Sequence, residues 1–390
     1  MIALLAAIAF LFITFNAAGQ SNGWFTGLGD LPGGETVSVA TAVSADGSVI
    51  VGSSSSFASV DNPPPPGSMF SDPFLGYEAF RWTREEGMVG LGDLPGDEYF
   101  HSFAEDVSAD GMTVVGGSWS ELSMQGMVPG SEGFRWRPGE GMRGIGVIPS
   151  IIQQHSPAYG VTANGEALTG MVAYHDGWYQ PFVWTEALGF VELGNLGGPV
   201  RFGRGLAVAL GGRVVVGSDN LRVKANQNLT VPTTMAIGGE PRPIELNSGA
   251  ARDVTRDGRM IVGLVGSGDF ARAVAWMDGR RIDLAVPSIE GFESSRALAV
   301  SSGTGHIVGT VRIAGESHAA IWSPGGACEV LTNALDRRRL DGSLKGWSLI
   351  EATDISDDGT TIVGTGLNPA GDLEAWGAWL VDAPRERVLK

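Results

Sequence analysis

Aromatic and histidine side chains gather in the segments that join the strand-like runs of this chain, and they have the most scope for chemistry. Tryptophan and tyrosine combine a large apolar ring with a polar group, which suits contacts with sugars and peptides. Histidine is the commonest transition-metal ligand. The candidate ligand-binding residues are Tyr99, Phe100, His101, Trp119, His155, His175, Trp178 and Tyr179. The alternative is that these rings fold back over the scaffold and only pack against it.

Three histidines of this group are the weak candidates for a shared metal: His101, His155 and His175. Their separation matches no compact metal-binding motif such as HExxH, so we expect no metal and no cofactor. The sequence has no GxxxxGK[ST] phosphate-binding loop, and nothing in it selects a Ser-His-Asp triad. No catalytic residue is therefore assigned.

A repeated pattern of eleven residues indicates which scaffold positions these side chains. The first copy, residues 42–52, reads AVSADGSVIVG, and further copies follow at residues 106–116, 160–170, 207–217, 253–263, 299–309 and 354–364. Most copies contain an Asp-Gly or Asn-Gly pair, which favours a tight hairpin turn. Repeats at a period of about 20–50 residues are typical of solenoids, propellers and arrays.

Each repeat contains four strand-like runs. Small residues come first, then β-branched residues ending in glycine, then a run ending in tryptophan, then a glycine-rich run such as residues 87–94. The fourth repeat departs from this pattern, because Met235 occupies the position where the tryptophan is expected. Closely spaced short strands with turn signals predict an all-β fold, a seven-bladed β-propeller of four-stranded antiparallel blades.

The two ends of the repeat array complement each other. The last repeat lacks a good fourth strand, whereas residues 24–31 (WFTGLGDL) are a fourth strand without the other three. We expect this N-terminal strand to complete the last blade and close the ring, which removes exposed strand edges. A single propeller then covers residues 20–390, with blade repeats centred on residues 38–94, 102–148, 156–196, 204–246, 248–285, 294–332, and 347–382 plus 24–31.

Residues 1–19 are predicted to be a signal peptide. The apolar run at residues 2–15 is shorter than the roughly 20 residues of a membrane span. Ala17 and Gly19 suit a cleavage site. We therefore expect a secreted, periplasmic or cell-surface protein without a membrane span after signal removal. An uncleaved anchor is the alternative.

The chain is acidic, with 43 Asp and Glu against 26 Lys and Arg and a formal net charge of −17. Proteins contact phosphate backbones through Lys and Arg, so nucleic acid is excluded as a partner. A high net charge keeps an exported protein soluble, and we expect a monomer. The single cysteine, Cys328, rules out an intramolecular disulfide.

Short motifs give the chain a family resemblance. The pieces GLGDL (residues 27–31 and 90–94) and SADG (residues 44–47 and 108–111) resemble the repeats of the HAF-type probable extracellular repeat proteins of bacteria. That family is named for a His-Ala-Phe triplet, which here reads EAF at residues 78–80 and keeps its histidine at His318. The resemblance covers the mature chain and implies an exported repeat protein of unestablished activity, without catalytic residues to carry over.

These observations favour a non-enzymatic binding scaffold for a glycan or a protein, acting through the one face of the propeller that carries the longer loops. The alternative is a hydrolase or lyase for extracellular polysaccharide with its site at the mouth of the central channel. A purely structural envelope component is a third reading. The first strands are expected to line the channel, and their charged residues are Glu105, Asp106, Arg252, Asp253, Arg296 and Asp354. Structural salt bridges would explain why charged residues occur there.

Overall fold

The turn between the first and second strands of a repeat is stabilised by its own aspartate. Asp46 Oδ1 accepts hydrogen bonds from the Ser44 hydroxyl (2.8 Å), the Ser48 hydroxyl (2.7 Å) and the Ser48 backbone N–H (3.0 Å). The following residue, Gly47, has a φ of 72°, a left-handed conformation that glycine adopts without strain. The local sequence therefore determines where the hairpin reverses.

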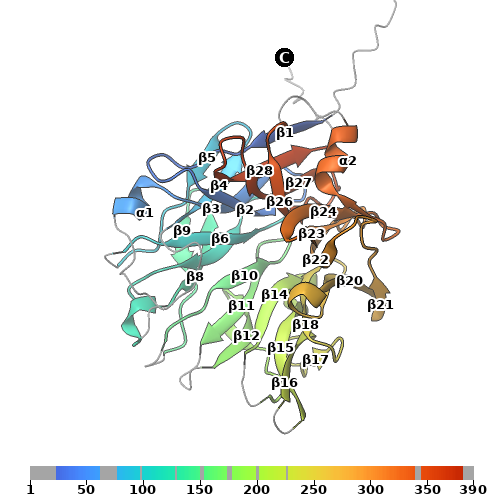
Figure 1. Ribbon diagram of the computed structural model, residues 1–390. Helices are drawn as coiled ribbons and strands as arrows, with labels where there is room; N and C mark the ends of the chain where they lie inside the picture. Colours follow the sequence, from blue (N-terminus) through green and yellow to red (C-terminus); the bar gives the residue numbers. More distant parts are fainter. Residues whose placement is uncertain are drawn as a thin grey trace, which may run out of the picture.

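The computed structural model describes residues 23–61, 77–96, 99–127, 130–149, 153–173, 178–198, 202–224, 227–338 and 344–380. In these ranges the strands form seven antiparallel sheets of four strands each, which follow one another as the blades of a ring (Figure 1). The predicted all-β, seven-bladed propeller is confirmed. Blades 1 to 6 follow one another along the chain as β2–β5, β6–β9, β10–β13, β14–β17, β18–β21 and β22–β25, and blade 7 is β26–β28 with β1.

The first, innermost strands of blades 1 to 7 are β2 (Ser38–Val43), β6 (Ser102–Val107), β10 (Ala158–Val161), β14 (Arg204–Ala209), β18 (Gly249–Val254), β22 (Phe292–Val300) and β26 (Ser348–Ile355). The second strands are β3 (Val49–Ser54), β7 (Val114–Ser118), β11 (Ala167–Ala173), β15 (Val214–Lys224), β19 (Met260–Val265), β23 (Ile307–Ile313) and β27 (Thr361–Leu367).

The third strands are β4 (Glu78–Thr83), β8 (Glu132–Arg137), β12 (Tyr179–Thr185), β16 (Gln227–Met235), β20 (Arg272–Met277), β24 (Glu316–Trp322) and β28 (Leu373–Trp379). The outermost strands are β5 (Gly87–Gly90), β9 (Gly141–Gly144), β13 (Gly189–Glu192), β17 (Arg242–Pro243), β21 (Arg280–Asp283), β25 (Cys328–Val330) and β1 (Trp24–Gly27). Short helices lie between strands: α1 (Phe57–Asp61), α2 (Leu331–Arg337), η1 (Ser123–Gln125), η2 (Leu210–Gly212) and η3 (Gly268–Phe270).

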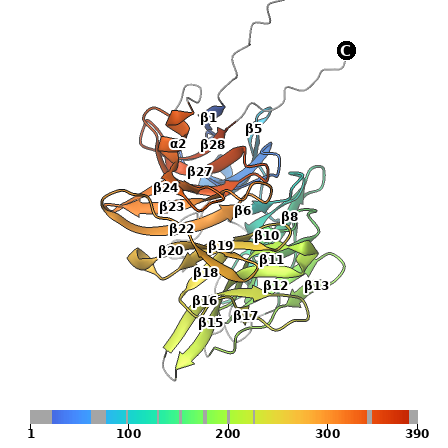
Figure 2. The same ribbon diagram turned by 90° about the vertical axis from the view of Figure 1, so that its right-hand side faces the viewer.

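The ring is closed by the N-terminal strand, as the sequence predicts. Strand β1 pairs antiparallel with β28, so that Trp24 lies opposite Trp379 and Gly27 lies opposite Trp376. Figures 1 and 2 both place β1 beside the C-terminal strands of blade 7. The Phe25 side chain is fully buried and makes an edge-on contact with Trp347, with ring centroids 5.4 Å apart.

Serine residues at the start of the first strands connect neighbouring blades. The Ser102 hydroxyl accepts a hydrogen bond from the Ala79 N–H of blade 1 (3.0 Å) and donates one to Gly92 O (2.6 Å). Ser38 makes the same pair of bonds to blade 7, with Ala375 N–H and Gly29 O. These buried contacts explain why the first strands carry small polar residues rather than large apolar ones.

Aromatic side chains of the third strands fill the space between blades. Phe80 and Phe134 are fully buried, as is Trp322, and Trp276 is 2% exposed. In blade 4 the corresponding position is Met235, which pairs with Val215 as Trp276 pairs with Ile261 in blade 5. Blade 4 is also the blade whose long second and third strands project in Figure 1.

The predicted signal peptide, residues 1–19, lies outside the described residues, so export stays a prediction. In the part of the chain that the structure describes, no helix is long and apolar enough to cross a membrane. Cys328 is half-buried against an apolar cluster between blades 5 and 6, and burial raises the pKa of its thiol to about 12.

Candidate functional site

The channel is shaped by a bulge that recurs at one position in every first strand. In each blade the pairing between the first and second strands shifts by one residue at the same repeat position. A bulge leaves its extra residue outside the ladder and re-aims that side chain. The seven extra residues all line the cavity in the channel: Thr41, Glu105, Tyr159, Leu206, Arg252, Leu298 and Thr353.

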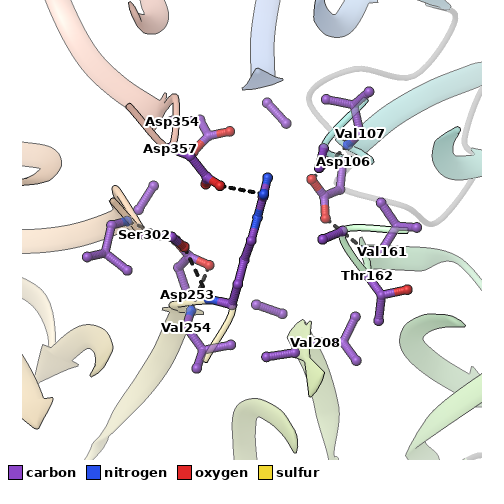
Figure 3. A pocket seen from close by; sticks show the side chains of 18 of the residues that line it. Asp106, Val107, Val161, Thr162, Val208, Asp253, Val254, Ser302, Asp354 and Asp357 are labelled. Atoms are coloured by element: carbon purple, nitrogen blue, oxygen red, sulfur yellow. Dashed lines mark hydrogen bonds and ion pairs between the residues drawn. The ribbon is translucent and has the colours of Figure 1, made fainter. Parts of the chain in front are cut away.

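A collar of β-branched residues follows two positions later in each first strand. Its members all line the same cavity: Val43, Val107, Val161, Val208, Val254, Val300 and Ile355. Figure 3 shows four of them, Val107, Val161, Val208 and Val254, around the cavity. The cavity has a volume of about 360 Å³ and extends to the turns between the first and second strands. We name the end of the propeller that carries these turns the turn face, and the opposite end the loop face.

Three aspartates between the bulge residues and the collar clamp neighbouring blades together. Asp106 Oδ1 accepts the N–H of Val107 in its own strand (2.7 Å), and its Oδ2 accepts the N–H of Val161 in blade 3 (2.8 Å). Asp253 binds Val254 and, in blade 6, Val300 at the same two distances. Asp354 binds Ile355 and, in blade 1, Val43 in the same way. Figure 3 shows the three carboxylates on different sides of the cavity.

Each aspartate clamp joins two neighbouring blades. Since the ring has seven blades, three clamps leave one blade without a clamp. They join blade 2 to 3, blade 5 to 6 and blade 7 to 1. Blade 4 has Ala207 at the clamp position, and blade 3, which precedes it, has Gly160. The collar residue of blade 4, Val208, is therefore the one without a neighbouring aspartate in either strand.

Enclosure in the channel weakens the acidity of these carboxyl groups. Burial raises the pKa of Asp106 to about 7 and that of Asp253 to about 6, while the backbone hydrogen bonds oppose the shift. Burial, together with repulsion from the charges of Asp253 and Asp106, raises the pKa of Asp354 well above its usual value. The surfaces of these aspartates are partly accessible, but they face the channel rather than bulk water.

Arg252 and Arg256 both line the cavity, and only Arg256 has an ion-pair partner among the described residues. The Arg252 side chain is accessible from the channel, but protein surrounds the channel and shields the guanidinium from bulk water. This desolvation lowers the pKa of the guanidinium. Among the described residues it has no hydrogen bond or ion pair, and its charge interacts over longer range with Glu351 and Glu105. At the turn face, Arg256 of blade 5 forms a 2.6 Å ion pair with Asp357 of blade 7 at the mouth of the channel.

The aromatic residues predicted on the loop face of blade 2 pack against one another. His101 and Trp119 are each 1% exposed, with ring centroids 5.5 Å apart in an edge-on contact. The half-buried Tyr99 makes an edge-on contact with Trp119 at 6.2 Å, and Phe100 is half-buried beside it in sequence. Burial lowers the pKa of His101 to about 4, so this imidazole is neutral at physiological pH.

A second group of predicted residues lies at blade 3. His155 is buried and its Nδ1 accepts a 2.9 Å hydrogen bond from the Ser131 N–H. The half-buried Tyr179 contacts the His155 ring edge-on and donates a 2.5 Å hydrogen bond from its hydroxyl to Gln153 Oε1. Burial, with a smaller effect of Arg204, lowers the pKa of His155 to about 3. Trp178 is half-buried, and His175 lies outside the described residues.

The structure therefore brings the predicted residues into two packed groups rather than one open site. Their role in ligand binding stays a prediction. Within the described ranges, no group of three or more His, Cys, Asp or Glu side chains is placed to hold a metal ion.

The expectation that salt bridges explain the charged residues of the first strands is wrong for the aspartates. Asp106, Asp253 and Asp354 bind backbone N–H groups, because each sits next to a bulge where the collar N–H of the adjacent blade is within reach. A signal for this role is present in the sequence: aspartate recurs at one position of the eleven-residue pattern in blades 2, 5 and 7.

No family model matches the chain, and no curated protein matches it. Among solved structures it is similar to an oligogalacturonate lyase from Vibrio parahaemolyticus, with 8% identity, a TM-score of 0.53, and coverage of 91% of this chain and 96% of that chain. It is also similar to the β-propeller domain of the Trilobed protease from Pyrococcus furiosus, with 10% identity, a TM-score of 0.52, and coverage of 90% and 100%.

TolB from Acinetobacter baumannii matches less well, with 12% identity and a TM-score of 0.45; the match covers 72% of this chain and 62% of the length of TolB. At these identities the comparisons show the β-propeller fold alone.

Proposed function

We propose that this protein is a non-enzymatic binding scaffold that holds a carboxylate of its ligand in the channel cavity, against Arg252. The observation that carries the proposal is the Arg252 guanidinium, which is enclosed by protein, faces the cavity and has no partner among the described residues. A guanidinium binds a carboxylate through paired N–H groups in a fixed planar geometry. The uronic acid of a glycan and the C-terminus of a protein both offer this group.

The use of the three aspartates supports binding rather than catalysis. A raised pKa, such as that of Asp106, suits a general base. Both oxygens of this carboxylate, however, are engaged with backbone N–H groups that hold two blades together. A carboxylate with that structural duty is poorly placed to exchange a proton with a substrate. We therefore favour the scaffold over the alternative polysaccharide hydrolase or lyase.

The proposed ligand enters from the turn face, because the cavity extends to the turns there, whereas the sequence pattern favours the loop face. Its volume of about 360 Å³ lies at the lower end of the roughly 300–1,000 Å³ of small-molecule sites. That space suits one terminal unit of a polymer. The Arg256–Asp357 ion pair lies at the mouth, and we infer that it opens when a ligand enters.

Isothermal titration calorimetry tests the proposal with two matched pairs of probes. One pair is a uronic acid trisaccharide and its carboxyl-reduced form, and the other is a tetrapeptide with a free or an amidated C-terminus. We expect one of the two carboxylates to bind with a dissociation constant below 1 mM and its neutral counterpart to bind at least about tenfold more weakly, since hydrogen bonds to charged groups contribute about 1.5–3 kcal/mol.

Arg252→Gln should weaken binding by about 10- to 100-fold. Arg259→Gln is the control, because Arg259 is an exposed residue paired with Asp278 at the surface. Absence of binding for both carboxylates contradicts the proposal, and cleavage of the trisaccharide establishes the enzyme instead.

We also propose that the chain is an exported member of the HAF-type repeat proteins. The GLGDL and SADG pieces support this assignment. Expression of the full chain in a bacterial host, followed by N-terminal sequencing of the protein outside the cytoplasm, tests cleavage after residue 19.

A further inference from the structure

The turn face carries a second cavity, a groove between blades 7, 1 and 2 with a volume of about 940 Å³. Tryptophans from all three blades line it, namely Trp379, Trp82 and Trp136. Met112 and Val89 also line it and are 47% and 46% exposed. We call this cavity the tryptophan groove. It is separate from the Arg252 cavity and shares none of its residues.

Two buried polar atoms of the tryptophan groove have no hydrogen-bond partner within the described ranges. They are the Oγ1 of Thr361, a residue that is fully buried, and the Nε of Arg81. A buried polar group without a partner costs about 1–3 kcal/mol, so a native protein keeps such groups where a ligand or water satisfies them. Both residues line the same groove, which points to a ligand there.

In blade 2 the threonine equivalent to Thr361 has a hydrogen-bond partner for its hydroxyl. Thr113 and Thr361 are each the second residue after the turn glycine. The Thr113 hydroxyl accepts a 3.1 Å hydrogen bond from Arg137 Nε. In blade 7 the residue opposite Thr361 is Trp379, whose indole N–H donates to Gly47 O instead. Among the described residues, the buried hydroxyl of Thr361 therefore lacks the partner that Thr113 has.

Blades 1 and 2 differ in how an arginine of the third strand contacts the tryptophan of the next blade. Arg135 of blade 2 lies 6.0 Å above the ring of Trp184 in blade 3 and forms ion pairs with Glu186 and Glu140. Arg81 occupies the same position in blade 1, where Glu86, at 3.1 Å, is its one ion-pair partner among the described residues. Among the described residues, no cation–π contact joins Arg81 to Trp136. The Trp136 ring, which is half-buried, thus stays available on the groove side.

Acidic side chains of the groove offer acceptors for hydroxyl groups. The side-chain hydrogen bonds of Asp46 and of Asp358 all end on Oδ1, within their own turns. The Oδ2 of each carboxylate has no side-chain hydrogen bond to the described part of the chain, so it can accept one from a ligand. Four acidic residues line the groove against two arginines, so an anionic ligand is disfavoured.

We propose that the tryptophan groove binds a neutral oligosaccharide. Sugar hydroxyls both donate and accept, so they can serve the two aspartates, Arg81 and Thr361 together, while the C–H faces of the sugar rings pack on Trp136 and Met112. A volume near the upper end of the usual range for small-molecule sites fits several sugar units.

Tryptophan fluorescence tests the proposal, because the groove is lined by three tryptophans. The probes are neutral hexasaccharides, a β-1,4-glucan, an α-1,4-glucan, a β-1,4-xylan and a β-1,4-mannan, with hexagalacturonate as the anionic comparison and a neutral hexapeptide as the protein-like one. We expect at least one neutral hexasaccharide to shift the emission with a dissociation constant below 1 mM, more tightly than the other two probes.

Thr361→Val should weaken that binding by about 3- to 10-fold, the loss of one hydrogen bond, and should leave the protein folded because it removes an unsatisfied hydroxyl. Thr113→Val is the matched control, and it should leave the affinity unchanged. Arg252→Gln should also leave it unchanged, which separates this site from the channel cavity. The proposal is overturned if none of the neutral hexasaccharides binds at 5 mM, if the peptide or hexagalacturonate binds more tightly, or if Thr361→Val binds as well as the native protein.

Discussion

The carboxylate of Asp354 joins the last blade of the ring to the first. Its Oδ2 accepts a 2.8 Å hydrogen bond from the backbone N–H of Val43, which lies 311 residues earlier in the sequence. Together with the pairing of β1 and β28, this bond closes the propeller at two radii, one at the channel and one at the outer edge. The closing blade is therefore held from inside as well as from outside.

Asp354→Asn should lower the free energy of unfolding by about 1–3 kcal/mol, because the amide can offer only one acceptor to two buried N–H groups. Urea denaturation followed by circular dichroism measures the change. Asp283→Asn is the control, since Asp283 is exposed and its ion pair with Arg281 contributes little. Equal stability of the two variants would contradict the clamp.

The clamp carboxyls should also make stability depend on pH. The folded-state pKa values of about 7 for Asp106 and about 6 for Asp253 lie above the ordinary 3.8. Between these limits the folded state binds more protons than the unfolded state, so the stabilisation is complete below about pH 4 and is lost as the pH rises through 6 to 7. Asp106→Asn removes one titrating group. We expect the difference in denaturation midpoint between native protein and variant to shrink from pH 4.5 to 7.5, and a difference that grows over this range would refute the assignment.

Phe25→Ala should cost about 3–5 kcal/mol of stability, because the ring of this closing-strand residue is fully buried in the apolar cluster between blades 6 and 7. It packs on Trp376, with ring centroids 6.0 Å apart, as well as on Trp347. Thermal denaturation provides the measurement. Phe57→Ala, at a residue that is 63% exposed, is the comparison and should change stability little. A loss below about 1 kcal/mol for Phe25→Ala would mean that the N-terminal strand does not hold the ring closed.

Blade 4 should be the first part of the ring to open. Backbone hydrogen bonds connect the turns of blades 1, 2 and 3, as from Ala45 N–H to Ala109 O and from Ala109 N–H to Ala163 O. In the described part of the chain no such bond reaches the turn of blade 4, which is the short helix η2, and no clamp aspartate serves it. Hydrogen exchange measured by mass spectrometry should therefore be faster in β14 and β15 than in β22 and β23. Uniform protection around the ring would show that the clamps carry no local stability.

The blades could be predicted from the sequence because their signals are local. The Asp46 and Gly47 turn is specified within five residues, a run rich in small residues precedes it, and a β-branched run follows it. The closing strand could be predicted too, because residues 24–31 match the outermost strand of other repeats.

The site could not be predicted in the same way, because its contacts join distant parts of the chain. Asp106 and Asp253 reach collar residues 55 and 47 positions away, and a bulge in each strand decides which side chains enter the channel. The aromatic residues are easy to find in the sequence, but their burial is not. Trp119 is covered by His101 and Tyr99, which lie in the loop before β6. This burial results from the packing of loops, and the repeat pattern of the sequence does not predict how loops pack.

The antiparallel seam between β1 and β28 also determines how the ring responds to mechanical load. Trp24, near the beginning of the described chain, lies opposite Trp379, near its end. A force that separates the two ends of the chain therefore acts on the seam like a zipper, loading its hydrogen bonds one after another from the Trp24 end rather than all together. The propeller should resist heat and denaturant as a closed ring, yet yield to tension at this seam before any blade is sheared.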